Sequence, residues 1–269
     1  MLRLNTMKMS FDTYLKSKGH SHKTIRSEIR NLTQYQNWLK GEGIESEETS
    51  YNDLLAYMKY LNQKGITKRT VQVYINTLKH YYNHLLESKV IIQNPAQDIQ
   101  VKGVKRSKLH YILAPHELHG VYTCDQDKSP NSTRNKVILG LLINQEIRSE
   151  ELGKLETKDI NLKAGTIRIP GTKKSNEREI ELRAQQIILM NQYKEGVKRE
   201  QFFEGNMNVI MSSLMYHLRK QYPTISVNQI RASVITKWLK QYNLRKTQYL
   251  AGHKYISSTE AYQKNDLER

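Results

Sequence analysis

The apolar residues of the first hundred positions repeat with a helical period, and capping residues interrupt them at regular intervals. Apolar side chains recur three and four residues apart, which is the repeat of one helix face. Ser50 followed by Asp53 has the form of a capping box, and Gly65 stands where that helix would end. We predict four helices: one around residues 11–15, one from about 21 to 41 or 43, one from 50 to 65, and one beginning at 67. Such a set makes a compact four-helix unit.

The period changes from helical to alternating between residues 158 and 182. Residues 166–169 alternate between apolar and polar side chains, Pro170-Gly171 marks a turn, and residues 178–182 alternate again. This pattern predicts a β-hairpin. From Ala184 onward the spacing is helical again. The predicted fold class is therefore mainly α with a small antiparallel β-sheet.

A basic segment separates the two halves of the chain. The first half ends near Asn94-Pro95, and the following segment crowds Lys102, Lys105 and Arg106 around Gly103. A glycine among basic residues favours a flexible connector lying along a charged backbone. We predict a helical N-terminal domain at residues 1–104 and a second domain at residues 105–269, each long enough to bury its own core.

The charge of the chain is strongly basic. Lysine and arginine number 43 against 26 acidic residues, a formal net charge of +17. A surplus of this size predicts attraction to a polyanion, with nucleic acid ahead of an anionic membrane, because no basic helix with a bulky apolar face stands out. A basic protein that merely stays in solution is the simpler alternative.

Three features bear on the compartment. The longest apolar run, residues 137–143, is far too short to span a bilayer, and the first residues show no secretory signal. Cys124 is the only cysteine, which fits a reducing compartment. We expect a cytoplasmic protein without membrane contact.

Two segments of the first half resemble each other. Residues 18–32 and 64–78 align at an offset of 46, and in both a glycine precedes a hydroxyl cap and basic residues at a helix start. Free N–H groups and basic side chains favour a phosphate there, although good caps also look alike without a shared role. The candidates for polyanion contact, including the connector, are Lys23, Arg26, Lys68, Arg69, Lys102, Lys105 and Arg106.

An ordered set of polar residues marks the second half. Arg148 stands at the junction between an apolar helix and the helix start RSEEL, and Glu151 follows one turn later. The loop of the hairpin contains Lys173, and a second arginine lies in NQIRAS at position 231. His253 closes the segment AGH, and Tyr262 follows nine residues later.

In order and spacing, this set resembles the catalytic domain of the tyrosine recombinases, the phage integrase and Xer group. The four-helix unit likewise resembles the core-binding domain of that family, so the resemblance covers nearly the whole chain. It implies metal-independent cleavage of a DNA phosphodiester, which needs a nucleophile, an acid for the leaving group and fixed positive charge. It assigns a role to each member: Tyr262 as the nucleophile, Arg148 and Arg231 on the non-bridging oxygens, Lys173 as the acid, His253 as a donor to the phosphate, and Glu151 as a residue that orients an arginine.

Two of these assignments have neighbours that compete. Lys174 exchanges with Lys173 if the loop shifts by one residue, and we favour Lys173. Tyr255 and Tyr249 lie in the same segment as Tyr262, but only Tyr262 stands at the expected distance from His253.

The sequence departs from the family pattern at Asn228. The usual His-x-x-Arg reads here as Asn228-Gln229-Ile230-Arg231. An asparagine can donate a hydrogen bond to a phosphate oxygen, but it cannot exchange a proton near neutral pH. We therefore expect a slower enzyme or one that depends more on His253, and an inactive protein is the alternative. Only QKNDLER follows Tyr262, so we expect little exchange of a C-terminal segment between protomers, or a truncated one.

The resemblance implies site-specific recombination of double-stranded DNA through a 3′-phosphotyrosine intermediate, for integration or excision of a mobile element. It implies a bacterial, nucleoid-associated protein that is a monomer in solution and a tetramer on paired DNA sites. The alternative is a catalytically impaired DNA-binding or architectural protein of the same fold, and nicking of the type IB topoisomerase kind is a lesser variant. We expect no metal and no cofactor: His80 with His84, and His116 with His119, have ligand-like spacing, but ordinary helix histidines are the favoured interpretation.

Overall fold

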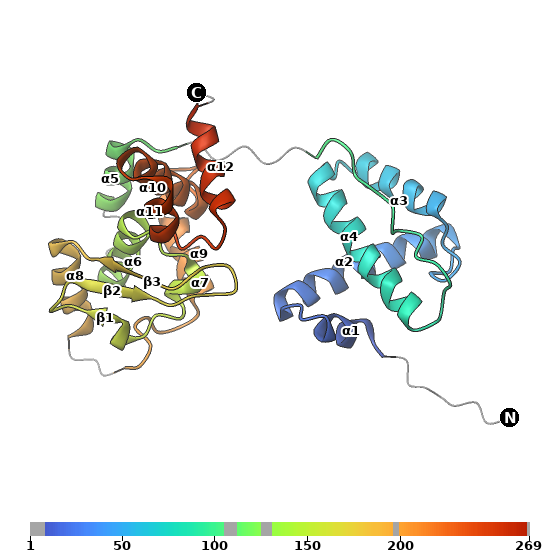
Figure 1. Cartoon of the computed structure of the whole chain (residues 1–269), viewed down its shortest axis with the longest axis horizontal. Helices are drawn as coiled ribbons and strands as arrows, with labels where there is room; N and C mark the ends of the chain where they lie inside the picture. Colours follow the sequence, from blue (N-terminus) through green and yellow to red (C-terminus); the bar gives the residue numbers. More distant parts are fainter. Residues whose placement is uncertain (1–8, 105–111, 125–130, 196–198, 268–269) are drawn as a thin grey trace. The chain divides into compact units, whose positions relative to one another are not determined.

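The computed structural model describes residues 9–104, 112–124, 131–195 and 199–267, with side chains described as far as residue 263. The chain divides into two compact units, Met1–Ser107 and Lys108–Arg269. Figure 1 shows that unit 1 is helical and that unit 2 combines helices with a small sheet. The predicted fold class is confirmed, because most described residues are helical and a single small antiparallel sheet is present among them.

Unit 1 contains the four predicted helices: α1 (Phe11–Ser17), α2 (His22–Glu42), α3 (Tyr51–Gln63) and α4 (Lys68–Glu87). Their starts follow the capping residues. The side chain of Ser21 accepts from the Thr24 N–H, and Ser50 and Asp53 form the predicted capping box. Helix α2 ends at Gly43, whose φ of 69° is a left-handed value that suits glycine.

The core of unit 1 is rich in tyrosine. Tyr35, Tyr57 and Tyr82 are fully buried, and the hydroxyls of Tyr35 and Tyr82 are 2.7 Å apart. The two segments that align at an offset of 46 begin α2 and α4, and these helices pack against each other. Asn31 donates a hydrogen bond of 3.2 Å to Thr77, which is its equivalent in the alignment.

Unit 2 begins with the helices α5 (Pro115–Thr123), α6 (Ser132–Asn144) and α7 (Ser149–Leu152) and a short 3₁₀ turn, η1 (Thr157–Asp159). The strands β1 (Ile160–Asn161), β2 (Thr166–Ile169) and β3 (Arg178–Glu181) follow in an antiparallel sheet of order β1-β2-β3. The pairing of β2 with β3 confirms the predicted hairpin, with Ile167 opposite Ile180. The sequence analysis did not predict β1, because two residues are too short to show alternation.

The remaining helices of unit 2 are α8 (Ala184–Lys194), α9 (Met207–Arg219), α10 (Val227–Gln241), α11 (Leu244–Leu250) and α12 (Ile256–Leu267). Its core forms around α6, which is buried on most sides: Ile138 and Leu141 have no exposed surface, and neither do Ile167 of β2 and Ile235 of α10. In Figure 1 the sheet lies beside α8, α10 and α12 lie toward the opposite end of the unit, and α11 lies between them and β3.

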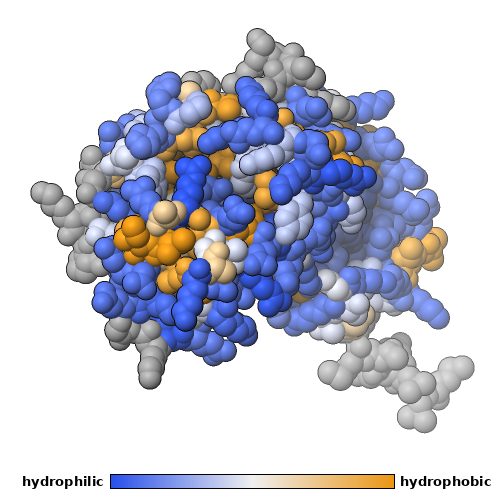
Figure 2. All heavy atoms as spheres, turned by 60° about the vertical axis from the view of Figure 1, so that its left-hand side comes forward, coloured by the Kyte–Doolittle hydropathy of each residue, from blue (hydrophilic) through white to orange (hydrophobic). Residues whose placement is uncertain are grey.

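Hydrophilic side chains cover most of the face drawn in Figure 2. No helix in the described part of the chain is both long and apolar enough to cross a membrane.

Candidate active site

A cavity of about 850 Å³ in unit 2 brings together the residues that the sequence analysis singled out. They come from elements far apart in the chain: the start of α7, the loop between β2 and β3, the first turns of α10, the turn before α12, and α12 itself. All six predicted catalytic residues line this cavity: Arg148, Lys173, Asn228, Arg231, His253 and Tyr262. The fold therefore brings these six residues, which are up to 114 positions apart in the sequence, to one cavity.

Arg148 is the N-cap residue of α7, with extended backbone angles. Its N–H donates 2.8 Å to the Glu151 carboxylate, and its Nη1 donates 3.3 Å to the carbonyl of Lys174. Its Nε is buried and has no hydrogen-bond partner among the described residues. Burial and the neighbouring Arg231 lower the pKa of Arg148 from its usual value. The unpaired Nε donor of Arg148 and the neighbouring charge of Arg231 together favour the binding of an anion.

Arg231 points from α10 toward the turn before α12. Its Nη1 donates 3.3 Å to the carbonyl of Glu146, and its Nη2 donates 3.3 Å to the carbonyl of Ala251. The same Nη2 lies 3.0 Å from Nε2 of His253. Because a guanidinium only donates, Nε2 of His253 accepts this hydrogen bond. Asn228, one turn earlier on α10, is exposed at the cavity.

His253 is 4% exposed and follows Gly252, whose φ is 61°. A Cβ at Gly252 would lie 2.9 Å from Cζ of Arg178, so a side chain has no room there. Burial, followed by the charge of Arg231, lowers the pKa of His253 to about 3. The ring is therefore neutral, and its Nδ1–H donates 2.8 Å to Thr259. In this state the Nδ1–H is engaged with Thr259 and Nε2 carries a lone pair, so donation to DNA requires both that Arg231 move and that Nε2 take a proton.

The histidine ring stacks on Tyr262. The ring centroids of His253 and Tyr262 are 5.9 Å apart, with an angle of 16° between the planes. Tyr262 is half-buried, whereas Tyr255 lines the same cavity but is 72% exposed. Tyr249 is not among the lining residues: its hydroxyl accepts from the Glu179 N–H and donates to the Glu179 carbonyl, both at 3.2 Å.

The loop between β2 and β3 is held against the histidine turn. Asn176 N–H donates 3.0 Å to the carbonyl of Gly252, and Ser175 forms a β-bridge with His253. Lys173 and Lys174 are both exposed and both line the cavity. The geometry therefore leaves the choice between the two lysines as the sequence analysis left it, with Lys173 favoured.

The sequence analysis missed Arg178, which forms the main ion pair of Glu151. Arg178 on β3 donates to both carboxylate oxygens, Nη1 to Oε1 at 2.9 Å and Nη2 to Oε2 at 3.1 Å, and neither side chain is exposed. Burial alone would raise the pKa of Glu151, but the hydrogen bonds and charge of Arg178, together with hydrogen bonds from the Arg148 N–H and Ser175, lower it. Glu151 thus positions Arg148 by accepting a hydrogen bond from the backbone N–H of Arg148. The same carboxylate binds the guanidinium of Arg178, a third arginine. The available signal was the alternation of this segment, in which Arg178 falls in phase with the apolar Ile180 and Leu182.

Glu146 is a second residue that the sequence analysis missed. It lies between α6 and α7, lines the cavity and is 1% exposed. Its carboxylate contacts Nη1 of Arg231 as an ion pair. Burial raises the pKa of Glu146 to about 8, against the opposing charges of Arg231 and Arg178. A charged residue directly after an apolar helix was the signal.

The candidate polyanion contacts of unit 1 are exposed. Lys23 and Arg26 lie at the start of α2, and Lys68 and Arg69 at the start of α4. Lys102 is also exposed, whereas Lys105 and Arg106 lie outside the described residues.

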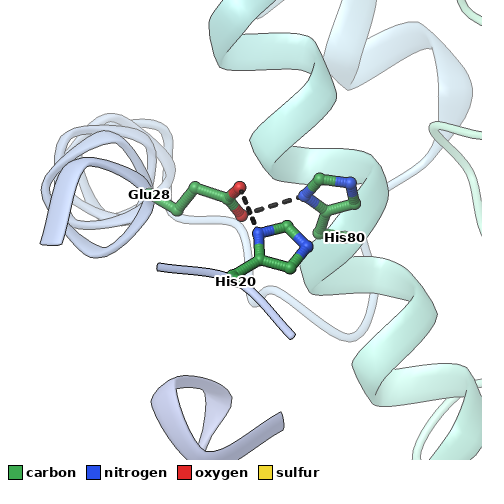
Figure 3. A group of neighbouring side chains, drawn as sticks. All are labelled: His20, Glu28 and His80. Atoms are coloured by element: carbon green, nitrogen blue, oxygen red, sulfur yellow. Dashed lines mark hydrogen bonds and ion pairs between the residues drawn. The ribbon is translucent and has the colours of Figure 1, made fainter. Parts of the chain in front are cut away.

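One group of side chains in the described part of the chain has the arrangement of a metal site. It consists of His20, Glu28 and His80 in unit 1 (Figure 3). Of the pairs considered from the sequence it contains His80 without His84, and neither His116 nor His119. His84 instead packs its ring against Tyr14 and Phe11.

Comparison with known proteins extends over both units. Residues 112–269 match the model of the Phage integrase family, and residues 9–89 match the model of the Phage integrase, N-terminal SAM-like domain. The chain is 26% identical to tyrosine recombinase XerC of Bacillus pumilus (strain SAFR-032), over 94% of this chain and 89% of the relative. It is 24% identical to tyrosine recombinase XerD of Shewanella oneidensis, over 93% and 89%.

Solved structures share the fold at lower identity. The Tn1549 transposon integrase in complex with a circular intermediate DNA superposes with a TM-score of 0.71 at 16% identity, over 97% of this chain and 99% of that chain. A lambda integrase dimer bound to a COC′ core site superposes with a TM-score of 0.75 at 14% identity, over 96% and 76%. With a family model matching more than half of its length, the chain belongs to the phage integrase family of tyrosine recombinases.

Proposed function

We propose that this protein cleaves and rejoins duplex DNA at specific sites through a covalent 3′-phosphotyrosine intermediate on Tyr262. The observation that carries the proposal is the cavity that unites two arginines, a loop lysine, His253 and Tyr262. The stacking of Tyr262 on His253 supports Tyr262 over Tyr255. The hydroxyl of Tyr249 is engaged with the backbone of Glu179, which argues against that residue.

Strand cleavage is a substitution at phosphorus. The Tyr262 oxygen forms a bond to phosphorus, the bond from phosphorus to the 5′-oxygen breaks, and the leaving oxygen takes a proton from Lys173. Arg148 and Arg231 hold the non-bridging oxygens with planar donors that stay charged. Rejoining is the reverse, with a 5′-hydroxyl attacking phosphorus and releasing the tyrosine.

The candidate acceptor for the phenolic proton of Tyr262 is His253. Asn228 cannot take a proton, whereas His253 carries a lone pair on Nε2 and stacks on Tyr262. In the DNA-free structure Arg231 donates a hydrogen bond to this lone pair. A phosphate that draws Arg231 away would free Nε2, and its negative charge would raise the basicity of the ring.

We assign the two parts different tasks: residues 1–104 bind duplex DNA through the basic starts of α2 and α4, and residues 105–269 carry the chemistry. The net charge of +17 and the exposed Lys23 and Arg69 support DNA contact. The matched structures include complexes of the Tn1549 integrase with circular intermediate DNA and a lambda integrase tetramer on a Holliday junction. By analogy we propose a mobile-element recombinase that is a monomer in solution, forms a tetramer on paired sites, and works on the bacterial nucleoid.

A second candidate function is DNA binding without cleavage. Two observations favour it: Asn228 stands where the family has histidine, and Glu146 contacts an arginine that the chemistry needs. Trapping separates the two candidates. The protein is incubated, in EDTA, with nicked duplexes from its genomic neighbourhood and resolved on a denaturing gel. A covalent adduct supports the recombinase, and site-specific binding without an adduct, in both wild type and Asn228→His, supports the DNA-binding protein.

A further inference from the structure

Glu146 combines two unfavourable features at the wall of the cavity. Its φ is 55°, a left-handed value that residues with a Cβ rarely adopt, and its carboxylate is 1% exposed. Strained backbone and buried charge persist only where the surroundings hold them, and they concentrate at functional sites. Because Glu146 lines the cavity beside Arg231, its function is to be sought there.

The charges around Glu146 do not cancel evenly. Arg178 is matched by Glu151 in a fully buried pair, which leaves Arg148 and Arg231 as the arginines that face the cavity. Glu146 is the carboxylate that contacts one of these two. When Glu146 is ionised, its negative charge therefore opposes the binding of a phosphate at Arg231.

Arg231 has both terminal nitrogens engaged with the protein. Nη1 contacts the Glu146 carboxylate and carbonyl, and Nη2 binds the Ala251 carbonyl and His253. A bidentate contact with phosphate needs donors that are free. Releasing Nη1 from Glu146 is thus a condition for the arginine to hold DNA, and releasing Nη2 frees His253 as well.

We propose that Glu146 is a positioning residue that holds Arg231 in the DNA-free protein and competes with the DNA phosphate for its guanidinium. The proposal deepens the recombinase function and rests on it. Where Glu146 is ionised, the site stays closed to phosphate until the right DNA engages it, which limits cleavage away from the target.

The test compares cleavage of a nicked duplex at saturating DNA by wild type, Glu146→Gln, Glu146→Gly and the control Glu150→Gln. Gln keeps the shape without the charge, Gly suits the left-handed backbone, and Glu150 is an exposed neighbour. The ionisable groups around Glu146 are Arg231 of α10, Arg178 of β3, Arg148 and Glu151 of α7, with His253 touching Arg231. Only ionised Glu146 holds Arg231, so the cleavage rates of both variants should rise relative to wild type as pH increases. Near pH 9 we expect both variants to cleave about tenfold faster than wild type, which corresponds to one charge-assisted hydrogen bond.

Several results would overturn the proposal. Variants with the wild-type rate and pH profile show that Glu146 does not compete, and slower variants with the wild-type profile show a merely structural role. If no protein forms an adduct, the recombinase function fails separately. The competition between Glu146 and phosphate is then measured by the rise in melting temperature on adding inorganic phosphate. This rise should be larger in Glu146→Gln than in wild type, and an equal rise in the two proteins rejects the competition.

A second, independent proposal concerns unit 1, where two histidines bracket a buried carboxylate (Figure 3). Glu28 on α2 is 8% exposed. Its Oε1 lies 3.3 Å from Nδ1 of His20, and its Oε2 lies 2.9 Å from Nδ1 of His80 on α4. The ligand atoms of the three residues all lie within 4.8 Å of one another.

Two imidazole nitrogens and one carboxylate are a donor set of zinc sites with an open fourth position. Tetrahedral zinc with ligands at about 2.0–2.1 Å places neighbouring donor atoms about 3.3 Å apart. The two histidine nitrogens lie 3.3 and 2.9 Å from different oxygens of Glu28, and one donor atom from each residue lies within 4.8 Å of the others, so an ion would draw one oxygen and both nitrogens together. Helices α2 and α4 are packed together and joined by the hydrogen bond from Asn31 to Thr77, so two of the ligands sit on a rigid frame. The side chain of His80 is 39% exposed, which lets an ion and a water reach the group.

We propose that His20, Glu28 and His80 bind one divalent transition-metal ion of the zinc class, linking the turn before α2 to α4. The turn leads into the basic start of α2, so the ion would fix the backbone that carries Lys23.

The full-length, metal-free protein is titrated with zinc chloride by calorimetry. One saturable site is expected, with affinity at least tenfold weaker in His80→Ala and in Glu28→Gln and unchanged in His22→Ala, an exposed neighbour outside the group. If Glu28→Gln fails to fold, the partly exposed His80 still decides the question. No saturable binding by wild type, or equal binding by His80→Ala, rejects the site.

Discussion

Arg178 and Glu151 form a two-point ion pair with no exposed surface, and this pair joins β3 to the helix start that carries Arg148. The same Glu151 carboxylate accepts from the Arg148 N–H. One buried carboxylate therefore connects the hairpin, whose loop carries the lysines, with the arginine at the cavity.

Removing Arg178 should destabilise the fold strongly. Arg178→Ala leaves Glu151 buried without its partner, which costs about 3–5 kcal/mol. The control is Arg168→Ala, which breaks an exposed pair with Glu177 and should lower the free energy of unfolding far less. Urea unfolding measures both free energies. Equal losses in the two variants would show that the buried pair does not hold the hairpin.

Tyr262→Phe should abolish the covalent adduct while leaving folding and DNA binding intact, because it removes one oxygen and little volume. Tyr255→Phe, which alters an exposed tyrosine of the same cavity, should keep the adduct. The measurement is denaturing electrophoresis of a labelled nicked duplex in the presence of EDTA. An adduct from Tyr262→Phe would reject this tyrosine as the nucleophile.

Arg231→Lys should lower the cleavage rate by at least about 100-fold, because a point charge cannot replace the bidentate donor. DNA affinity should stay within roughly tenfold, since other phosphate contacts persist. Single-turnover cleavage and fluorescence anisotropy give the two quantities. Near-normal cleavage would mean that Arg231 does not hold the phosphate.

Glu146 should make the stability of the protein depend on pH. Its pKa is raised from 4.5 to about 8 in the folded state, so the folded protein keeps a proton that the unfolded chain releases. The resulting stabilisation is complete below about pH 4.5 and is lost as pH rises through 8, a change on the order of 3–5 kcal/mol. The difference in unfolding free energy between wild type and Glu146→Gln isolates it, because His253 titrates in both proteins. A difference that does not change with pH would contradict the raised pKa.

DNA binding should weaken steeply with salt as counterions return to the backbone. Lys23→Glu and Arg69→Glu should lower affinity for all duplexes alike, because phosphate contacts carry no sequence information. Lys59→Glu, an exposed change on α3 outside the basic helix starts, is the control. Binding that is insensitive to salt, or an equal loss in all three variants, would place the DNA elsewhere.

Local chemistry determined much of the fold from the sequence alone. The Ser50–Asp53 capping box, the Gly43 helix end and the hairpin around Pro170-Gly171 each depend on residues within a few positions of one another, and each is present in the structure. Resemblance to the tyrosine recombinase motif, in order and spacing, also singled out Arg148, Lys173, Asn228, Arg231, His253 and Tyr262, and these residues line one cavity. Their catalytic roles stay predictions.

Tertiary structure alone decided the partners of the buried charges. Arg178 pairs with Glu151 at a separation of 27 residues, Arg231 meets Glu146 at 85, and His80 reaches Glu28 at 52. A charged side chain in a sequence reads as exposed by default, and only the packing of helices and strands shows which ones lose water and must find a partner. The sequence motif could therefore indicate His253 and Tyr262 as site residues. Only the fold could show that Arg231 donates a hydrogen bond to His253 and that Glu146 contacts Arg231.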